Sequence, residues 1–255
     1  MLKLSVEIAA NYSNSSQRVR VMTEYWVKNS VFCPSCGNNL TNFENNKPVA
    51  DFYCKKCSEE YELKSKHGAM GKKIIDGAYS TMIERLKSEN NPNFFFLTYD
   101  KSTFEIKNFL TIPKYFFVPD IIVKRKALGV TARRAGWIGC NIDMNNIPEF
   151  GKIFYVQNGV AKNRDEVLGK WNKTEFVKST HDVESKGWML DVLICIERIK
   201  KNEFSLDDVY NFESHLKARH SSNNNVKAKI RQQLQYLRDK NIIEFVGRGQ
   251  YRLKV

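Results

Sequence analysis

The feature that most constrains the fold is a set of four cysteines in two Cys-x-x-Cys pairs, Cys33/Cys36 and Cys54/Cys57, with seventeen residues between the pairs. One such pair can hold a metal ion from a tight turn, and two pairs close a tetrahedron of thiolates. Gly37 follows the first pair, where this turn commonly needs a positive φ. Four thiolates leave no position for water, so the spacing predicts a structural Zn²⁺ site. The alternatives are two disulfides, which a reducing compartment disfavours, or free buried thiols.

Charged residues that could carry chemistry flank the second cysteine pair. Asp51 precedes the pair, and Glu62 and Lys64 follow it. Alternate residues of a strand share a face, so Glu62 and Lys64 would point the same way. A hairpin that turns at the cysteines would bring Asp51 beside them, and its two carboxylates would suit Mg²⁺. The pattern predicts a catalytic centre in which Lys64 orients or activates water and stabilises the developing anion. An ordinary charged strand surface is the alternative.

Hydrophobic periodicity predicts mixed helices and strands in the first two thirds of the chain. Helices are expected at about residues 14–29 and 74–89, and strands within residues 91–100 and 151–159. This order predicts an α/β domain with a central mixed sheet, followed by a polar hinge over residues 158–182. The two remaining cysteines, Cys140 and Cys195, lie in apolar stretches and are expected to be core thiols.

The pattern changes after Ser185 to three helical segments and a short hairpin. The last helix is expected at about residues 223–240, and the hairpin surrounds Gly247-Arg248-Gly249. Three helices followed by a basic, glycine-tipped hairpin are typical of a winged helix-turn-helix. The predicted domains are therefore a catalytic α/β domain over residues 1–180 and a DNA-binding winged helix over residues 181–255.

The charge of the chain favours a polyanionic partner, nucleic acid before a membrane surface. Forty-one basic residues stand against twenty-eight acidic ones, a net charge of +13. From residue 215 to the end, ten Lys or Arg residues stand against two acidic residues. A second basic cluster consists of Lys124, Arg125, Lys126, Arg133 and Arg134. Without a signal peptide or a long apolar run, we expect a cytoplasmic protein with no membrane partner.

Asp51, Glu62 and Lys64 resemble the acid, acid and lysine of the PD-(D/E)xK nuclease superfamily. More narrowly, the chain resembles the DpnI family of methyl-directed restriction endonucleases. The matching stretches run from end to end: CPSCGNN, FENNKPVADFYCKKCSEEYELKSK, DGAYSTM, NPNFFFLTY, TARRAGWIGCNID and IRQQLQYLRDKNIIEFVGRGQYR. The resemblance implies a PD-(D/E)xK core with an embedded zinc site, in a bacterial type II site-specific deoxyribonuclease. It also implies Mg²⁺-dependent cleavage of double-stranded DNA at GATC sites that carry N6-methyladenine, with both domains recognising the methylated sequence.

Residue chemistry then suggests which side chains read the DNA. An N6-methyl group is a small apolar feature of the major groove, so an aromatic wall such as Trp137 suits it, although a buried core Trp is the alternative. Glutamine suits adenine edges, and arginine suits guanine or phosphate. The predicted DNA contacts are Arg133, Arg134, Trp137, Arg231, Gln232, Gln233 and Arg248.

Two other functions are compatible with the sequence. A winged-helix regulator would bind DNA without cutting it, and a nuclease of the same fold could have a different specificity. The regulator hypothesis leaves unexplained why Asp51, Glu62 and Lys64 would share one face. We expect the enzyme to be a monomer.

Overall fold

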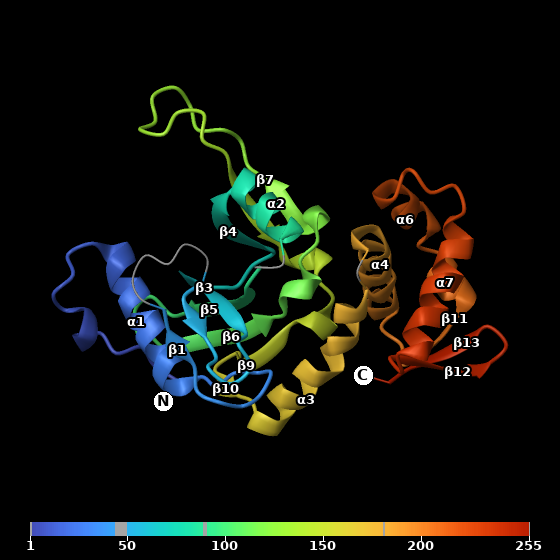
Figure 1. The fold of residues 1–255 in the computed structure, drawn as a ribbon, viewed down its shortest axis with the longest axis horizontal. Coiled ribbons are helices and arrows are strands. Elements are labelled where there is room, and N and C mark those ends of the chain that lie inside the picture. The colour runs from blue at the N-terminus through green and yellow to red at the C-terminus, as the bar shows by residue number, and fades with distance from the viewer. Residues whose placement is uncertain (1, 44–49, 89–90, 181, 255) are drawn as a thin grey trace. The chain divides into compact units, whose positions relative to one another are not determined.

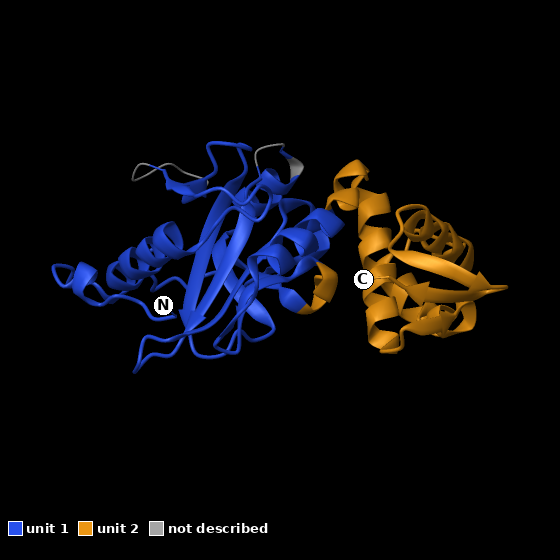
Figure 2. Cartoon of the chain, turned by 90° about the horizontal axis from the view of Figure 1, so that it is seen from below, with its two compact units in different colours: residues 1–144, 151–174 blue, residues 145–150, 175–255 orange. Residues whose placement is uncertain are grey.

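The computed structural model describes residues 2–43, 50–88, 91–180 and 182–254, and their contacts divide the chain into two compact units (Figures 1 and 2). Unit 1 comprises residues 1–144 and 151–174, and unit 2 comprises residues 145–150 and 175–255. The helices of unit 1 are α1 (Ser15–Ser30), α2 (Tyr79–Lys87) and α3 (Arg164–Thr174), with short 3-10 turns η1 (Glu7–Ala9), η2 (Lys114–Phe116) and η3 (Pro119–Ile121).

The strands of unit 1 form two sheets. They are β1 (Thr41–Asn42), β2 (Phe52–Tyr53), β3 (Glu60–His67), β4 (Lys73–Ala78), β5 (Asn93–Tyr99), β6 (Ile106–Ile112), β7 (Ile122–Lys124), β8 (Gly139–Asp143), β9 (Ile153–Gln157) and β10 (Val160–Ala161). Within the described residues, the larger sheet has the order β1-β2-β3-β5-β6-β9-β10, and the smaller one has the order β4-β8-β7. In the larger sheet β3 and β5 are parallel and the other neighbours are antiparallel. This is the central mixed sheet that the sequence predicted.

The centre of the larger sheet is buried because its central strand is apolar on both faces. All seven residues of β5 are buried. Phe95 stacks on Tyr61 of β3 with ring centroids 4.5 Å apart, and Phe94 packs on Phe117 at 4.4 Å. Trp26 of α1 contacts Phe109 of β6 edge-to-face at 5.1 Å. The helix therefore covers one face of the sheet at the strands that carry the predicted site.

The smaller sheet corrects one prediction. The helix expected over residues 74–89 begins only at Tyr79, and the preceding residues form β4; residue 89 lies outside the described residues. Ile74 pairs with Ile142 of β8, and Asp76 pairs with Cys140. The β-branched residues of β4 suit this antiparallel pairing, which overrides their helical spacing. Asp76 thereby stands on a strand and not on a helix.

Unit 2 is a winged helix. Two short turns lie at its boundary with unit 1: η4 (Met144–Asn146) begins at the last residue of the first segment of unit 1, and η5 (Glu149–Gly151) ends at the first residue of the second segment of unit 1. The other elements are η6 (Glu175–Ser179), α4 (Val183–Ile199), β11 (Glu203–Ser205), α5 (Leu206–Tyr210), α6 (Glu213–Arg219), α7 (Val226–Asp239), β12 (Ile243–Gly247) and β13 (Gln250–Leu253). The three strands form a sheet in the order β11-β13-β12, among the residues described. These helices and the terminal hairpin confirm the helix-turn-helix prediction.

Two details of the predicted organisation differ from the structure. The polar hinge expected over residues 158–182 is largely helical, because α3 and η6 occupy residues 164–179. Val167 and Trp171 bury the inner face of α3, which a count of polar residues does not reveal. The second of the three predicted helical segments, which follows Ser205, forms two helices, α5 and α6. No helix in the described ranges combines the length and apolar character needed to cross a bilayer.

Candidate active site and metal centre

The four predicted zinc ligands lie together in unit 1. The Sγ atoms of Cys33 and Cys57 are 3.5 Å apart, and those of Cys36 and Cys54 are 3.4 Å apart. All four sulfur atoms lie within 4.8 Å of one another. Four thiolates around one Zn²⁺, with bonds of about 2.3 Å, are about 3.8 Å apart. The cluster therefore fits a tetrahedral zinc ion.

Two similar turns present these cysteines. The backbone N–H of Gly37 donates to the Cys33 carbonyl at 2.8 Å, and that of Ser58 donates to the Cys54 carbonyl at 2.9 Å. The residue after each pair has a positive φ, +77° at Gly37 and 60° at Ser58. The positive φ expected at Gly37 is confirmed, and Ser58 adopts the same conformation without the freedom of glycine.

Hydrogen bonds and burial act on the thiols of the cluster in opposite directions. The hydroxyl of the buried Tyr61 lies 3.1 Å from Cys33 Sγ, and the side-chain amide of Asn38 donates to Cys36 Sγ at 3.5 Å. Burial raises the pKa values of the Cys33 and Cys57 thiols. Burial also acts on Cys36, but the hydrogen bonds from Asn38 and its neighbours lower that pKa to about 7. All six cysteines are free, and Cys140 and Cys195 are buried as expected.

Glu62 and Lys64 form a close ion pair on β3. Lys64 Nζ lies 2.6 Å from Glu62 Oε1 and 2.6 Å from Oδ1 of Asp76 on β4. Arg85 of α2 reaches the other oxygen of Glu62 at 3.2 Å. Strand alternation places Glu62 and Lys64 on one face of the sheet, as predicted, and two partners from neighbouring elements complete the cluster.

Burial and neighbouring charges shift the pKa values of Glu62 and Lys64. The side chains of Glu62 and Lys64 are 14% and 23% exposed. Burial raises the pKa of Glu62, while Lys64 and Arg85 act in the opposite direction. Burial alone would lower the pKa of Lys64, but the carboxylates of Glu62 and Asp76 raise it well above its usual value. The ammonium group is therefore held in its charged form.

Asp51 is attached to the same strand through the backbone. Its Oδ2 accepts a hydrogen bond from the N–H of Leu63 at 2.7 Å, between Glu62 and Lys64. The N–H of Asp51 donates to the Tyr61 carbonyl at 2.9 Å, although Phe52 is the residue paired with Tyr61. Asp51 is thus held against β3 by two hydrogen bonds, one from its backbone N–H and one to its side chain. The sequence predicted Asp51 beside Glu62 and Lys64. In the structure the partners of these two side chains are Asp76 and Arg85, and the Asp51 side chain accepts from the Leu63 amide.

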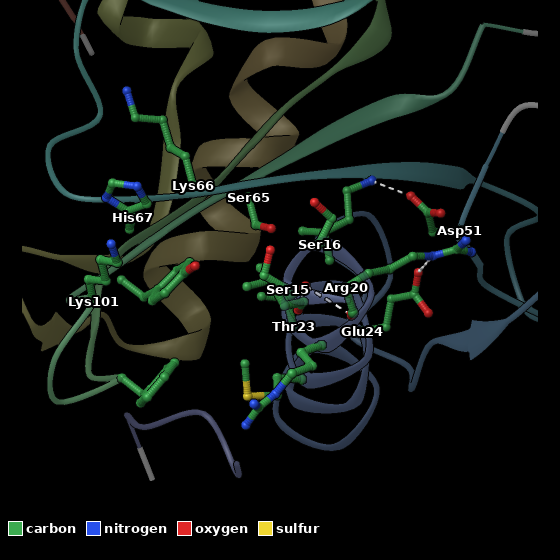
Figure 3. A pocket seen from close by; sticks show the side chains of 16 residues that line it. Ser15, Ser16, Arg20, Thr23, Glu24, Asp51, Ser65, Lys66, His67 and Lys101 are labelled. Atoms are coloured by element: carbon green, nitrogen blue, oxygen red, sulfur yellow. Dashed lines mark hydrogen bonds and ion pairs between the residues drawn. The ribbon is translucent and has the colours of Figure 1, made fainter. Parts of the chain in front are cut away.

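Asp51 also lines a cavity of about 750 Å³ between α1 and β3. Figure 3 shows it near Arg20 and Glu24, with Lys66, His67 and Lys101 farther along the cavity. Arg20 and Glu24 form an ion pair at 2.5 Å. Burial raises the pKa of Glu24, opposed by Arg20 and reinforced by the negative charge of Asp51.

The basic cluster of unit 1 begins at Lys124, the last residue of β7, and its other members lie on the loop between β7 and β8, residues 125–138, which extends away from its sheet (Figure 1). Arg133 and Arg134 are exposed. Trp137 is half-buried, and the guanidinium of Arg134 lies 4.7 Å from the centre of its ring. Trp137 also packs over the backbone of Gly139, where an added Cβ would come within 2.8 Å of the ring. Trp137 is thus held at the base of the loop and is not enclosed in the core.

The residues predicted to read DNA from unit 2 lie on α7 and the wing. Arg231 and Gln232 are exposed on α7, and Arg231 donates to the Tyr210 hydroxyl at 2.7 Å. Arg248 is exposed in the turn between β12 and β13. Gln233 departs from the prediction, since it is only 5% exposed. Helical spacing places it with Ile230 and Leu237 on the inward face of α7, so its side chain points away from the face that would contact a DNA groove.

Sequence reasoning missed Asp76 and Arg85, the two partners that complete the Glu62 and Lys64 cluster. Both stand in the stretch DGAYSTMIERLK, which by pattern resembles one surface helix. The only local signal is Asp76-Gly77, a dipeptide typical of a turn or a bulge, and β4 does shift register between Asp76 and Ala78. Nothing in the spacing indicates that β4 reaches Lys64.

Apart from the four cysteines, no group of three or more acidic, histidine or cysteine side chains in the described ranges is arranged to hold a metal. The carboxylates that contact Lys64 are those of Glu62 and Asp76, and the Asp51 carboxylate lies at the Leu63 amide of the same strand. A hairpin with a four-cysteine cluster and a largely buried acid and lysine, on a mixed sheet and in one chain with a winged helix, defines a protein of the nuclease class that acts on DNA.

Comparison with protein families agrees with this assignment to the nuclease class. The model described as DpnI, Dam-replacing family, matches residues 1–180, and the model described as Dam-replacing HTH domain matches residues 184–253. The chain belongs to the DpnI, or Dam-replacing, family of methylation-dependent restriction enzymes that act on DNA.

Proposed function

We propose that this protein is a cytoplasmic type II restriction endonuclease that cleaves double-stranded DNA at GATC sites carrying N6-methyladenine. The observation that carries the proposal is the largely buried Glu62 and Lys64 pair on the hairpin with the four-cysteine cluster, within a chain matched by both family models. Cleavage is phosphodiester hydrolysis with Mg²⁺ as cofactor.

Asp51 and Glu62 are the side chains that would hold Mg²⁺. The donor set fits, because carboxylate oxygens are the ligands that this ion prefers. When bound, the ion lowers the pKa of water and neutralises charge on the phosphate. Asp51 is already fixed by the Leu63 amide, and Glu62 by Arg85 and Lys64.

Lys64 stabilises charge in this proposal and does not act as a base. Its ammonium is held charged by two carboxylates, so it has no lone pair with which to accept a proton from water. With two of its N–H groups directed at Glu62 and Asp76, the ammonium has one left to donate to a phosphate oxygen or to the attacking water, and this hydrogen bond strengthens as negative charge develops.

The two basic surfaces would bind the DNA. Arg133 and Arg134 would contact phosphates beside the target, and Trp137 would offer its half-exposed ring to the methyl group. Arg231, Gln232 and Arg248 would act from the winged helix. The sequence prediction for Gln233 is not carried into this proposal, because the residue is buried.

Digestion of one plasmid, prepared from an adenine-methylating and from a non-methylating host, tests the proposal. With Mg²⁺ present we expect only the methylated preparation to be cut. Equal cutting of both would indicate a nuclease of the same fold with another specificity. DNA binding without cutting of either would indicate a regulator.

A further inference from the structure

The side chain of Asp76 is almost entirely buried beside the Glu62 and Lys64 pair. It is 6% exposed, and its Oδ1 lies 2.6 Å from Lys64 Nζ and accepts from the Gly77 N–H at 2.6 Å. Its Oδ2 is enclosed without a hydrogen-bond partner in the described part of the protein. A buried carboxylate with one unsatisfied oxygen costs free energy of folding, so stability alone does not account for Asp76 at this position.

Asp76 restricts the lysine in a way that Glu62 alone does not. An ammonium group on a four-carbon chain is flexible, and a single partner leaves it free to rotate about that contact. Two carboxylates, each 2.6 Å from Nζ, hold it from two strands, β3 and β4. They use two of its three N–H donors and leave one for a third group.

Asp76 also connects the lysine to the loop that carries Trp137. Within the β4 and β8 pairing, Asp76 stands opposite Cys140, and Ala78 stands opposite Gly139 after a register shift. The thiol of Cys140 donates to the Gly77 carbonyl at 3.5 Å. The Trp137 ring packs over Gly139, the first residue of β8. A continuous series of packed groups therefore runs from Trp137 through β8 and β4 to Asp76 and Lys64.

We propose that Asp76 is a positioning residue: it fixes Lys64 for the cleavage step and links that lysine to the β7–β8 loop through β4 and β8. The inference rests on the proposed nuclease function. Asp76 acts on the reaction through Lys64, and a shift of the loop that moves β8 also moves the acceptor that holds the ammonium.

The test compares wild type with Asp76→Asn in single-turnover cleavage of methylated DNA. Misplacing a catalytic group by about 1 Å can slow a reaction by about 100-fold, so we expect a loss of this order. Affinity for methylated DNA without divalent metal, zinc content and melting temperature should stay near the wild-type values. Asp76→Glu keeps the charge and should recover part of the rate. Ile75→Thr, at the exposed neighbour of Asp76 on β4, is the matched control and should cut like wild type.

A second arm measures the link to the loop. Trp137→Ala and Asp76→Asn are combined, and the double variant should lose less rate than the product of the two single losses. If the two losses are independent and simply multiply, the link is overturned.

A normal cleavage rate in Asp76→Asn would overturn the positioning role, and so would a loss in Asp76→Glu as large as in Asp76→Asn. If wild type cuts no methylated DNA, the proposed function fails instead. Should Asp76→Asn fold poorly, the comparison of Asp76→Glu with Ile75→Thr decides.

Discussion

At Lys64, two carboxylates and one ammonium group share a space that is largely closed to solvent. Removing the lysine would leave Glu62 with Arg85 and would leave Asp76 with a buried, uncompensated charge. Breaking a buried pair in this way costs about 3–5 kcal/mol. A Lys64 variant therefore mixes a loss of stability with a loss of chemistry, and Asp51 offers a cleaner test of the site.

Asp51→Asn should abolish detectable cleavage while the protein stays folded. The amide oxygen of asparagine can still accept from the Leu63 N–H, but the side chain loses the negative charge that would bind Mg²⁺. Cleavage of methylated plasmid and thermal melting are measured on the same preparation. Methylated-DNA cutting at the wild-type rate would show that Asp51 is not a metal ligand.

Gly139→Ala should reduce recognition through Trp137. The new Cβ would lie 2.8 Å from the indole ring, so the ring must leave its place over β8. We expect weaker binding to methylated DNA, with binding to unmethylated DNA little changed. Gly129→Ala, in the loop that precedes β8, serves as the control, because an added Cβ there meets nothing within 4 Å. Equal effects of the two substitutions would argue against a role for the ring.

Among single residues, those with local signals were predictable. The cysteine spacing and the positive φ at Gly37 follow from the chemistry of one short turn. The partners of Lys64 do not, because Asp76 and Arg85 approach it from β4 and α2, and contacts between elements leave no periodic trace in a sequence. The inward direction of Gln233 was missed because a helix phase error of one residue moves a side chain by about 100°.

At the scale of elements, the hairpin of β2 and β3 depends on the turns that hold the cysteines. Cys54→Ser should lower stability strongly, since zinc binding contributes to the free energy of folding. Zinc content per protein and melting temperature are the measurements, and a strong chelator should reproduce the effect in wild type. A zinc-free Cys54→Ser protein with normal melting and full activity would refute the structural role of the ion.

The two cysteine turns differ in the residue that adopts positive φ, and this predicts opposite effects. Ser58→Gly should stabilise the protein by about 0.5–1 kcal/mol, because a side chain is strained in the left-handed region. Gly37→Ala should destabilise it, both through φ and because its Cβ would meet the Arg164 guanidinium at 2.7 Å. Chemical denaturation of the zinc-loaded variants measures both. A loss of stability in Ser58→Gly would contradict the assignment of strain.

At the scale of the whole molecule, removing residues 181–255 tests the division of labour. The truncated chain keeps the zinc cluster, Asp51, Glu62, Lys64 and Trp137. We expect weaker DNA binding, with residual cutting that still prefers methylated DNA. The truncation also removes Glu197, whose carboxylate accepts hydrogen bonds from the backbone N–H groups of Glu149 and Phe150 in segment 145–150. Melting of the truncated chain is therefore measured alongside cleavage, and residual cutting without methyl preference would place recognition in the winged helix alone.

The sequence alone determined the four-cysteine cluster, the mixed α/β sheet, the winged helix and the shared face of Glu62 and Lys64. Each of these depends on spacing along a few consecutive residues, which strand alternation, helix periodicity and tight-turn geometry convert directly into positions. Only the tertiary structure decided that β4 is a strand, that Asp51 bonds to the Leu63 amide, and that Asp76 shares Lys64 with Glu62. Those outcomes depend on which elements pack together, and packing joins residues that are far apart in sequence.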